Sequence, residues 1–311
     1  MRSSTRGRSA STAGRRSSRC SSAAGRPTQS GAMRLRSSRR STRRSSKPRG
    51  GSRVSDHDEL NAPVARVVRE IFGSVASLAV VGRLREEGVE AAFARLHEID
   101  ARLSPYRVDS EVSRIRDGAL APADAHPETR WILSACEALR EESGGLFDAR
   151  IAGVDGRLDP SGYVKGWAIG EAHRILIAAG MENCALGIGG DVAAAGEGPG
   201  GAGWVVGIAN PRDGATALAS VRLRDAAIAT SGEAERPGHL HDPSGGVAQS
   251  PFASFTVIGP AIDRVDALAT IGWLEGAAGI ERVDAEEGYG ALAVYRDGRA
   301  VATEAFRAIA I

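Results

Sequence analysis

The sequence predicts an α+β fold, in which mixed sheets with flanking helices follow a basic N-terminal tail. Three observations support this prediction. Apolar residues recur at helical spacing in several segments before residue 181. Beyond that point, short apolar runs are separated by Gly, Pro, Asn and Asp, as in strands joined by turns. Strands and helices do not alternate regularly, which argues against a parallel βαβ sheet.

The N-terminal segment is the first element to consider. Its first 53 residues hold 16 Lys or Arg, many Ser and no acidic residue. Such a segment cannot bury enough apolar surface to offset its ordering entropy. We therefore expect residues 1–60 to be a disordered basic tail, with Met33 as an alternative start, and residues 61–311 to form one domain.

Charge and hydropathy narrow the function classes. Residues 54–311 contain 24 basic and 38 acidic residues, a net charge of −14, so we expect no nucleic-acid partner for the domain. No window has the 18 consecutive apolar residues of a transmembrane helix. No signal-peptide core closely follows the paired arginines of the tail. A cytoplasmic location is the default expectation, with export or membrane-surface association left open.

Hydrophobic spacing and turn residues predict the order of the elements. Extended structure comes first, over residues 64–83. Helices are expected over 86–104, 126–145, 162–180 and 262–275. A further short helix is expected after an N-cap at Asp109 or Ser110. Strands are expected within 183–198, 203–211, 218–232 and 252–259, and then in a closing hairpin of 289–298 and 299–307 that turns at Asp297 and Gly298.

Lys165 is conspicuous, because the only other lysine of the chain is Lys47 in the tail. An ammonium is a compact point charge and a guanidinium is a broad planar fork, so a retained lysine indicates a close-fitting site. It lies in DPSGYVKGWA, where Asp159 and Lys165 flank the start of a predicted helix. Free N–H groups and the helix dipole favour anions there. A leftover surface lysine is the alternative.

The segment GIGGDV, residues 187–192, opens like a dinucleotide-binding loop. Val192 replaces the last glycine of that motif and no helix follows, so we expect no Rossmann fold. We favour a tight bend from a strand into a turn, and the alternative is a glycine backbone that approaches a ligand closely beside the carboxylate Asp191. The chain also lacks the GxxxxGK[ST] motif of a phosphate-binding loop.

Two further groups of residues can carry chemistry. His239, His241 and Asp242 are close together in one predicted loop, which favours a general base or a metal site over a simple turn. Asp266 and Thr270 are four residues apart in a predicted helix, so their oxygens face the same side. Such hard oxygen ligands suit Mg²⁺ held together with a substrate phosphate, although an isolated pair of this kind is a weak signal.

In this order, the segments resemble the FAD:protein FMN transferases, the ApbE family. The resemblance spans roughly residues 64–311 and rests on SPYRVDSEVSRI, GGLFDAR, DPSGYVKGWAI, LGIGGDVAAAG, ATSG, HLHDPSG and DALAT. It implies an enzyme that splits the pyrophosphate of FAD with the help of Mg²⁺. FMN would pass to a Thr or Ser hydroxyl of an acceptor protein as a phosphoester, and AMP would be released.

The resemblance also implies roles for individual residues. Asp266, Thr270 and the backbone carbonyl of Gly162 would hold the metal ion. His239 would be the base for the acceptor hydroxyl, and Lys165 a positive charge beside the flavin nucleotide. The residues that would contact FAD are Phe72, Tyr106, Leu146, Phe147, Asp148, Asp159 and Lys165.

The chain departs from the family pattern in the segment between Asp148 and Asp159, which is shorter than usual and leaves recognition of an acceptor open. In addition, His241 stands where an apolar residue is usual. Two alternatives to the transferase therefore stay open. One is a Mg²⁺-dependent FAD pyrophosphatase that yields FMN and AMP, and the other is a flavin-binding protein without turnover.

Overall fold

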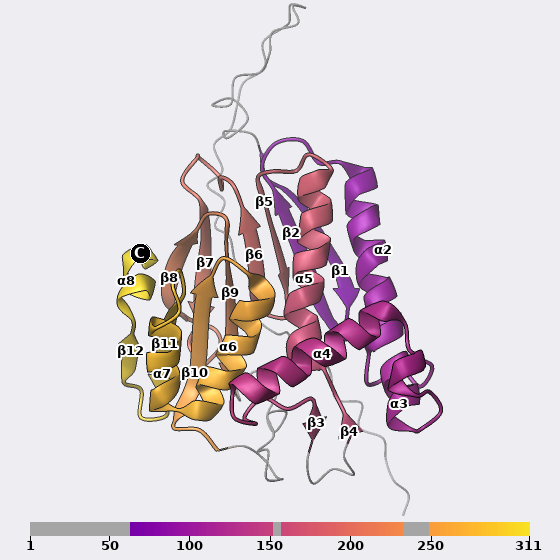
Figure 1. Cartoon of the computed structure of the whole chain (residues 1–311). Helices are drawn as coiled ribbons and strands as arrows, with labels where there is room; N and C mark the ends of the chain where they lie inside the picture. Colours follow the sequence, from indigo (N-terminus) through magenta and orange to yellow (C-terminus); the bar gives the residue numbers. More distant parts are fainter. Residues whose placement is uncertain (1–62, 152–156, 233–248) are drawn as a thin grey trace, which may run out of the picture.

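The computed structural model describes residues 63–151, 157–232 and 249–311. It confirms the α+β class. An antiparallel sheet is covered by a layer of helices on one face and by a two-stranded hairpin and a short helix on the other (Figure 1). The predicted tail, residues 1–60, and the loop that contains His239, His241 and Asp242 lie outside the described residues.

The main sheet has the strand order β1-β2-β5-β6-β9-β10-β11-β12, and each neighbouring pair is antiparallel. Its strands are β1 (Ala65–Ile71), β2 (Ser74–Val80), β5 (Cys184–Ile188), β6 (Asp191–Ala195), β9 (Ala226–Gly232), β10 (Phe252–Gly259), β11 (Gly290–Tyr295) and β12 (Ala300–Ala302). Two smaller pairs are β3 (Arg150–Ile151) with β4 (Arg157–Leu158), and β7 (Trp204–Ala209) with β8 (Ala217–Leu223).

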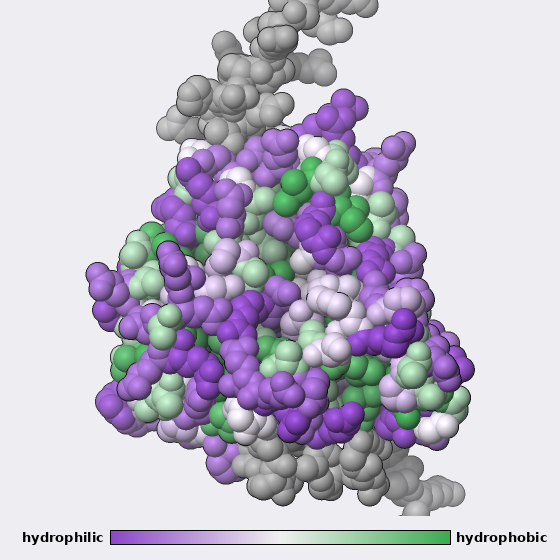
Figure 2. All heavy atoms as spheres, in the orientation of Figure 1, coloured by the Kyte–Doolittle hydropathy of each residue, from purple (hydrophilic) through white to green (hydrophobic). Residues whose placement is uncertain are grey.

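The helices are α2 (Glu86–Leu103), α3 (Glu111–Arg116), α4 (Pro127–Glu142), α5 (Ser161–Ala178), α6 (Ile262–Glu275), α7 (Ala277–Asp284) and α8 (Glu304–Ile309). Helices α2, α5 and α6 lie against one face of the sheet, and α4 crosses outside them (Figure 1). Their outward faces carry mainly hydrophilic side chains, with only separate apolar patches (Figure 2). No helix in the described ranges is long and apolar enough to cross a membrane.

Alternation along the central strands divides the core into two layers. Leu78 and Val80 of β2 pack with the helices, whereas Ala79 between them packs with the β7–β8 hairpin. Successive side chains of a strand point to opposite faces, so a strand covered on both faces must be apolar throughout. Strands β5 and β6 are accordingly buried at every position. They run through the middle of the molecule and bring the β5–β6 turn to the helical layer.

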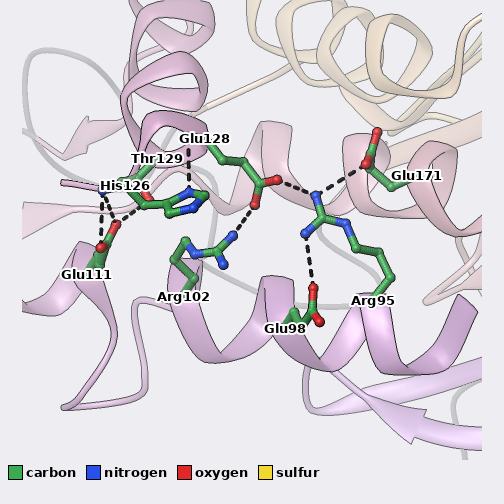
Figure 3. A network of polar contacts seen from close by, with 8 residues as sticks. All are labelled: Arg95, Glu98, Arg102, Glu111, His126, Glu128, Thr129 and Glu171. Carbon is green, nitrogen blue, oxygen red and sulfur yellow. Dashed lines mark hydrogen bonds and ion pairs between the residues drawn. The ribbon is translucent and has the colours of Figure 1, made fainter. Parts of the chain in front are cut away.

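A polar network holds α4 across the helical layer (Figure 3). Arg95 of α2 pairs with Glu128 of α4, and its guanidinium also lies 3.2 Å from Glu171 of α5. At the start of α4, the Thr129 hydroxyl donates to the Glu111 carboxylate at 2.5 Å. These side chains connect helices α2, α3, α4 and α5. A network with several shared partners orients helices better than an isolated surface ion pair does.

Most predicted elements are confirmed to within a few residues. Ser110 is the N-cap of α3, because its Oγ accepts a hydrogen bond from the Ser113 N–H at 3.0 Å. The closing hairpin does turn at Asp297 and Gly298, and Gly298 has a φ of 94°. The interpretation of residues 187–192 as a bend is also confirmed, since they form the β5–β6 hairpin.

Three element predictions are wrong or incomplete. Residues 64–83 are not one extended segment, since Phe72 and Gly73 adopt φ of 53° and 65° and turn β1 back into β2. Residues 299–307 form only the short strand β12 before α8 begins, with Thr303 as its N-cap. Helix α7 was not predicted. It starts directly after Gly276, whose φ of 71° reverses the chain at the end of α6.

The fold makes one prediction about pH. Burial lowers the pKa of His173 in α5, while a hydrogen bond with the Cys184 backbone partly opposes this shift. As the pH falls below about 6.5, His173 therefore binds a proton in the unfolded chain before it does so in the folded one. Its contribution to the free energy of unfolding is fully present above that pH and is lost below it. The slope contributed by one such group is at most about 1.4 kcal/mol per pH unit. We expect His173→Leu to reduce the loss of unfolding free energy between pH 7 and pH 5.

Urea unfolding at several pH values measures this effect. His97 is exposed, so His97→Leu is the control and should leave the pH slope unchanged. Equal slopes for the wild type and His173→Leu would show that His173 carries no such linkage.

Candidate active site

Lys165 lies between two buried carboxylates on the helical side of the sheet. Its ammonium nitrogen is 2.6 Å from Asp191 Oδ2 and 3.5 Å from Asp266 Oδ1. The side chains of Asp191 and Asp266 are 1% and 4% exposed, whereas Lys165 is 35% exposed and thus reaches the surface. Burying a carboxylate costs several kcal/mol unless it is paired, so two beside one lysine are an expensive arrangement. We call Lys165, Asp191 and Asp266 the lysine cluster.

Three separate elements supply the lysine cluster. Lys165 stands in the first turns of α5, Asp266 in the second turn of α6, and Asp191 is the first residue of β6. The turn before Asp191 consists of Gly189 and Gly190, both with positive φ, at 57° and 97°. Glycine adopts this conformation without strain, so β5 can reverse tightly and present the carboxylate to the helices.

Gly166 allows α5 and α6 to approach closely at this point. A methyl group on Gly166 would lie 2.8 Å from Asp266 Cβ and 2.8 Å from the Ile262 carbonyl oxygen. The Gly166 N–H donates to Asp266 Oδ2 at 2.9 Å. Asp266 is therefore bound by the backbone of α5 through one oxygen and faces the Lys165 ammonium with the other.

The electrostatics follow from burial. Burial raises the pKa of Asp266 to about 7; the Lys165 ammonium lowers it and the negative charge of Asp191 adds to the rise. Burial also raises the pKa of Asp191, against the lowering effect of Lys165. The cluster formally carries two carboxylates and one ammonium. A further cation beside Asp266 would favour its ionised form, because opposite charge offsets the cost of desolvation.

The predicted metal ligands lie on α5 and α6, the two helices that pack closely at Gly166. In a regular α-helix the Gly166 N–H points to the Gly162 carbonyl, and here it also bonds to Asp266, so both oxygens lie near the same N–H. Thr270 is one turn after Asp266, and its hydroxyl is 3.1 Å from the Ser231 hydroxyl at the end of β9. A carboxylate, a hydroxyl and a carbonyl fit Mg²⁺ chemically. Within the described ranges, no group of three His, Cys, Asp or Glu is arranged for a metal ion.

Several predicted FAD contacts surround the start of α5. Phe147 is buried, and its ring would lie 3.4 Å from a methyl group on Gly162. Asp159 Oδ1 accepts the Ser161 N–H at 2.9 Å, and Asp148 Oδ1 accepts the Arg150 N–H at 2.7 Å. Both carboxylates therefore shape local backbone in this structure. Leu146 precedes Phe147 and is half-buried.

Phe72 and Tyr106 lie in other turns. Phe72 is partly buried against the helical layer of the core, and its positive φ is unusual for a large residue. Tyr106 follows α2 and is 78% exposed. The contacts of these residues with flavin stay predictions, as does the role of His239. The described part of β9 ends at Gly232, next to the Ser231–Thr270 contact.

Two shallow grooves lie elsewhere on the described surface. One of about 530 Å³ lies between α4, α6 and α7, and one of about 430 Å³ between α4, α5 and α6. Neither is lined by Lys165 or Asp191. Charged side chains in the first groove already pair with each other, as Arg282 does with Glu275 at 2.7 Å. The lysine cluster is therefore the stronger candidate for chemistry.

The sequence interpretation missed two residues of this site. The sequence favours a bend at Asp191, which is correct for its backbone but does not reveal its contact with Lys165. Nothing in the sequence indicates Ser231 as a partner of Thr270. A carboxylate directly after two glycines was the available signal for Asp191, but only the strand order shows which helix it faces.

The α5–α6 contact gives a prediction with a matched control. Gly166→Ala should lower the free energy of unfolding by about 1–3 kcal/mol, because the added methyl group meets backbone and Asp266 Cβ. At Gly170, the nearest atom to a new methyl group is the Ile262 Cγ2 at 3.2 Å, the end of a movable side chain. Gly170→Ala should be neutral or stabilising by up to about 1 kcal/mol through helix propensity. Urea unfolding compares them, and equal effects would contradict this packing.

Comparison with solved structures shows which known proteins have a similar fold. The structure is similar to the flavin transferase ApbE from Vibrio cholerae, with a TM-score of 0.70 and 20% identity over 80% of this chain and 99% of that one. It is also similar to the flavinyl transferase ApbE of Pseudomonas stutzeri in its apo form, with a TM-score of 0.66 and 23% identity over 80% and 98%. For the ApbE protein of Thermotoga maritima, the TM-score is 0.70 and the identity 22% over 79% and 99%.

Sequence comparison gives the family. A search of curated protein sequences returned no match. The sequence profile described as the ApbE family matches residues 72–156 and 152–293, which together are most of the chain and include the whole lysine cluster. The chain therefore belongs to the ApbE family.

Proposed function

We propose that this chain is a Mg²⁺-dependent FAD:protein FMN transferase. It would move FMN from FAD to a Thr or Ser hydroxyl of an acceptor protein and release AMP. The observation that carries this proposal is the lysine cluster at the α5–α6 contact, with Thr270 one turn away. Family membership supports it, as does the similarity in fold to structures that are named flavin transferases.

The proposed metal ligands are Asp266, Thr270 and the Gly162 carbonyl. Mg²⁺ bound there would neutralise charge on a pyrophosphate and act as a Lewis acid. The Asp266 carboxylate is held in place by the Gly166 N–H, so it needs no rearrangement to present its other oxygen. The Thr270 hydroxyl is oriented by Ser231.

The remaining residues bind and orient the substrate. Lys165 places a positive charge beside the start of α5, where backbone N–H groups also favour phosphate oxygens. The buried ring of Phe147 provides an apolar surface at the same end of α5. Positioning and charge stabilisation are the main contributions that a protein makes to phosphoryl transfer.

The reaction balances as a substitution at phosphorus. The acceptor oxygen forms a bond to the FMN phosphorus while the bond from that phosphorus to the bridging oxygen breaks, and AMP leaves with the bridging oxygen. The hydroxyl proton passes to a base, for which we propose His239. If water attacks in place of the hydroxyl, the same residues give FMN and AMP, which is the pyrophosphatase alternative.

Chromatography of FAD incubated with the purified protein distinguishes these outcomes. The mixtures contain Mg²⁺ or EDTA, each with and without a protein that carries a threonine flavinylation site. We expect AMP and covalent flavin on the acceptor with Mg²⁺, and intact FAD with EDTA. AMP with free FMN in both Mg²⁺ mixtures would identify a pyrophosphatase, and intact FAD throughout would refute the catalytic proposal.

Substitutions in α6 test the metal ligands. We expect Asp266→Asn and Thr270→Val to lower the rate of AMP release by about 100-fold or more, because each removes a ligand without changing the side-chain shape. Asp263 is on the same helix but is not part of the lysine cluster. Its carboxylate accepts a hydrogen bond from the Tyr163 hydroxyl at 3.2 Å. Asp263→Asn is therefore the control, with an expected rate within about twofold of the wild type. Full activity of Asp266→Asn would exclude this metal site.

A further inference from the structure

Asp191 is the closer of the two carboxylates beside the Lys165 ammonium. The distance of 2.6 Å to Asp191 Oδ2 is that of a close ion pair, whereas 3.5 Å to Asp266 Oδ1 is that of a looser one. Of these two carboxylates, Asp191 on the sheet therefore holds the lysine more closely than Asp266 on α6. Asp191 has no role in the proposed chemistry so far.

The sheet holds the Asp191 carboxylate rigidly. Its Oδ1 accepts the Thr230 N–H of β9 at 3.3 Å, and its Oδ2 faces the ammonium. Its backbone is fixed by the Gly189–Gly190 turn and by pairing with Ile188. With 1% of its surface exposed, Asp191 is enclosed by the packed core, which limits its movement.

The lysine would otherwise compete with a metal ion. An ammonium and a divalent cation are both attracted to the free oxygen of Asp266, and Lys165 already lies 3.5 Å from it. Without the charge of Asp191, the electrostatically favoured partner of Lys165 is Asp266, because it is then the remaining buried carboxylate of the cluster. The ammonium would then neutralise the oxygen that the metal ion requires.

We propose that Asp191 is a positioning residue that holds the Lys165 ammonium away from Asp266. The ammonium is then available to a substrate phosphate, and the free oxygen of Asp266 is available to a metal ion. This inference rests on the proposed function for the identity of the two ligands. The anchoring of Lys165 by Asp191 does not depend on it. A purely structural Asp191, needed only to fill a polar position in the core, would affect folding but not the position of the lysine.

The first experiment observes the lysine directly. Because Lys47 and Lys165 are the only lysines of the chain, Lys47→Arg protein labelled with ¹³C at lysine Cε gives one NMR signal, that of Lys165. In the protein without metal and FAD, we expect Asp191→Asn to shift this signal and change its line width. Asp225 is the control, since its carboxylate is exposed but also accepts a backbone N–H, from Gly196 at 2.8 Å. Asp225→Asn should leave the signal unchanged.

The second experiment measures binding without turnover, by titration with Mn²⁺ alone and with FAD alone. In Asp191→Asn we expect both dissociation constants to rise roughly tenfold, because the ammonium then pairs with Asp266 and leaves its place beside the phosphate. The double variant Lys165→Met/Asp191→Asn has no ammonium to compete for Asp266. It should recover Mn²⁺ binding to within about threefold of the wild type while FAD binding stays weak.

The outcomes separate this inference from the proposed function. An unchanged Lys165 signal in folded Asp191→Asn would overturn the anchoring role. A double variant that does not recover Mn²⁺ binding would overturn the competition between lysine and metal. If the Lys165 signal responds to Asp191→Asn but the wild type binds neither Mn²⁺ nor FAD, the proposed function fails and the anchoring of Lys165 stands. If Asp191→Asn alone does not fold, the double variant still tests the competition, because Mn²⁺ can offset the charge of Asp266 that Lys165→Met leaves unpaired.

Discussion

Two carboxylates buried beside a single ammonium constrain much of this structure. Asp191 and Asp266 would each cost several kcal/mol if left unpaired, and Lys165 is the cation that offsets both. The arrangement requires α5, α6 and β6 to converge within ion-pair distance. The glycines at Gly166 and in the β5–β6 turn make that convergence sterically possible. The formal excess of one carboxylate over the ammonium is the reason that we propose a further cation here.

The two layers of the core explain why such a site is stable here. The β7–β8 hairpin covers the face of the sheet opposite the helices, so β5 and β6 are buried along their whole length. Asp191 begins one of these strands and is held by its neighbour β9. The helical layer is in turn held by the charged network of Arg95, Glu128 and Glu171 (Figure 3). A rigid sheet and a braced helix therefore position the opposite charges, as pre-organised sites require.

Local signals in the sequence predict much of the fold but not its long-range contacts. Helix α5 is predictable because apolar spacing extends to Gly180, and the end of the β11–β12 hairpin because Asp297 and Gly298 favour a turn. Helix α8 was missed because its residues resemble a strand, although Thr303 is a good N-cap. Lys165, Asp266 and Thr270 were recognised by residue type and family resemblance. Asp191 was not, because strand order and register decide that its side chain faces α5, and one sequence does not specify them locally.

Crystallography with Mn²⁺ and FAD tests the central claim most directly, since anomalous scattering locates the metal ion independently of any assay. The account predicts an anomalous peak at about 2.0–2.2 Å from an Asp266 carboxylate oxygen and the Thr270 hydroxyl. It also predicts that the Lys165 ammonium stays on Asp191 and faces a phosphate oxygen. A peak elsewhere, or FAD bound with its phosphates away from Lys165, would contradict the assignment of this cluster as the active site.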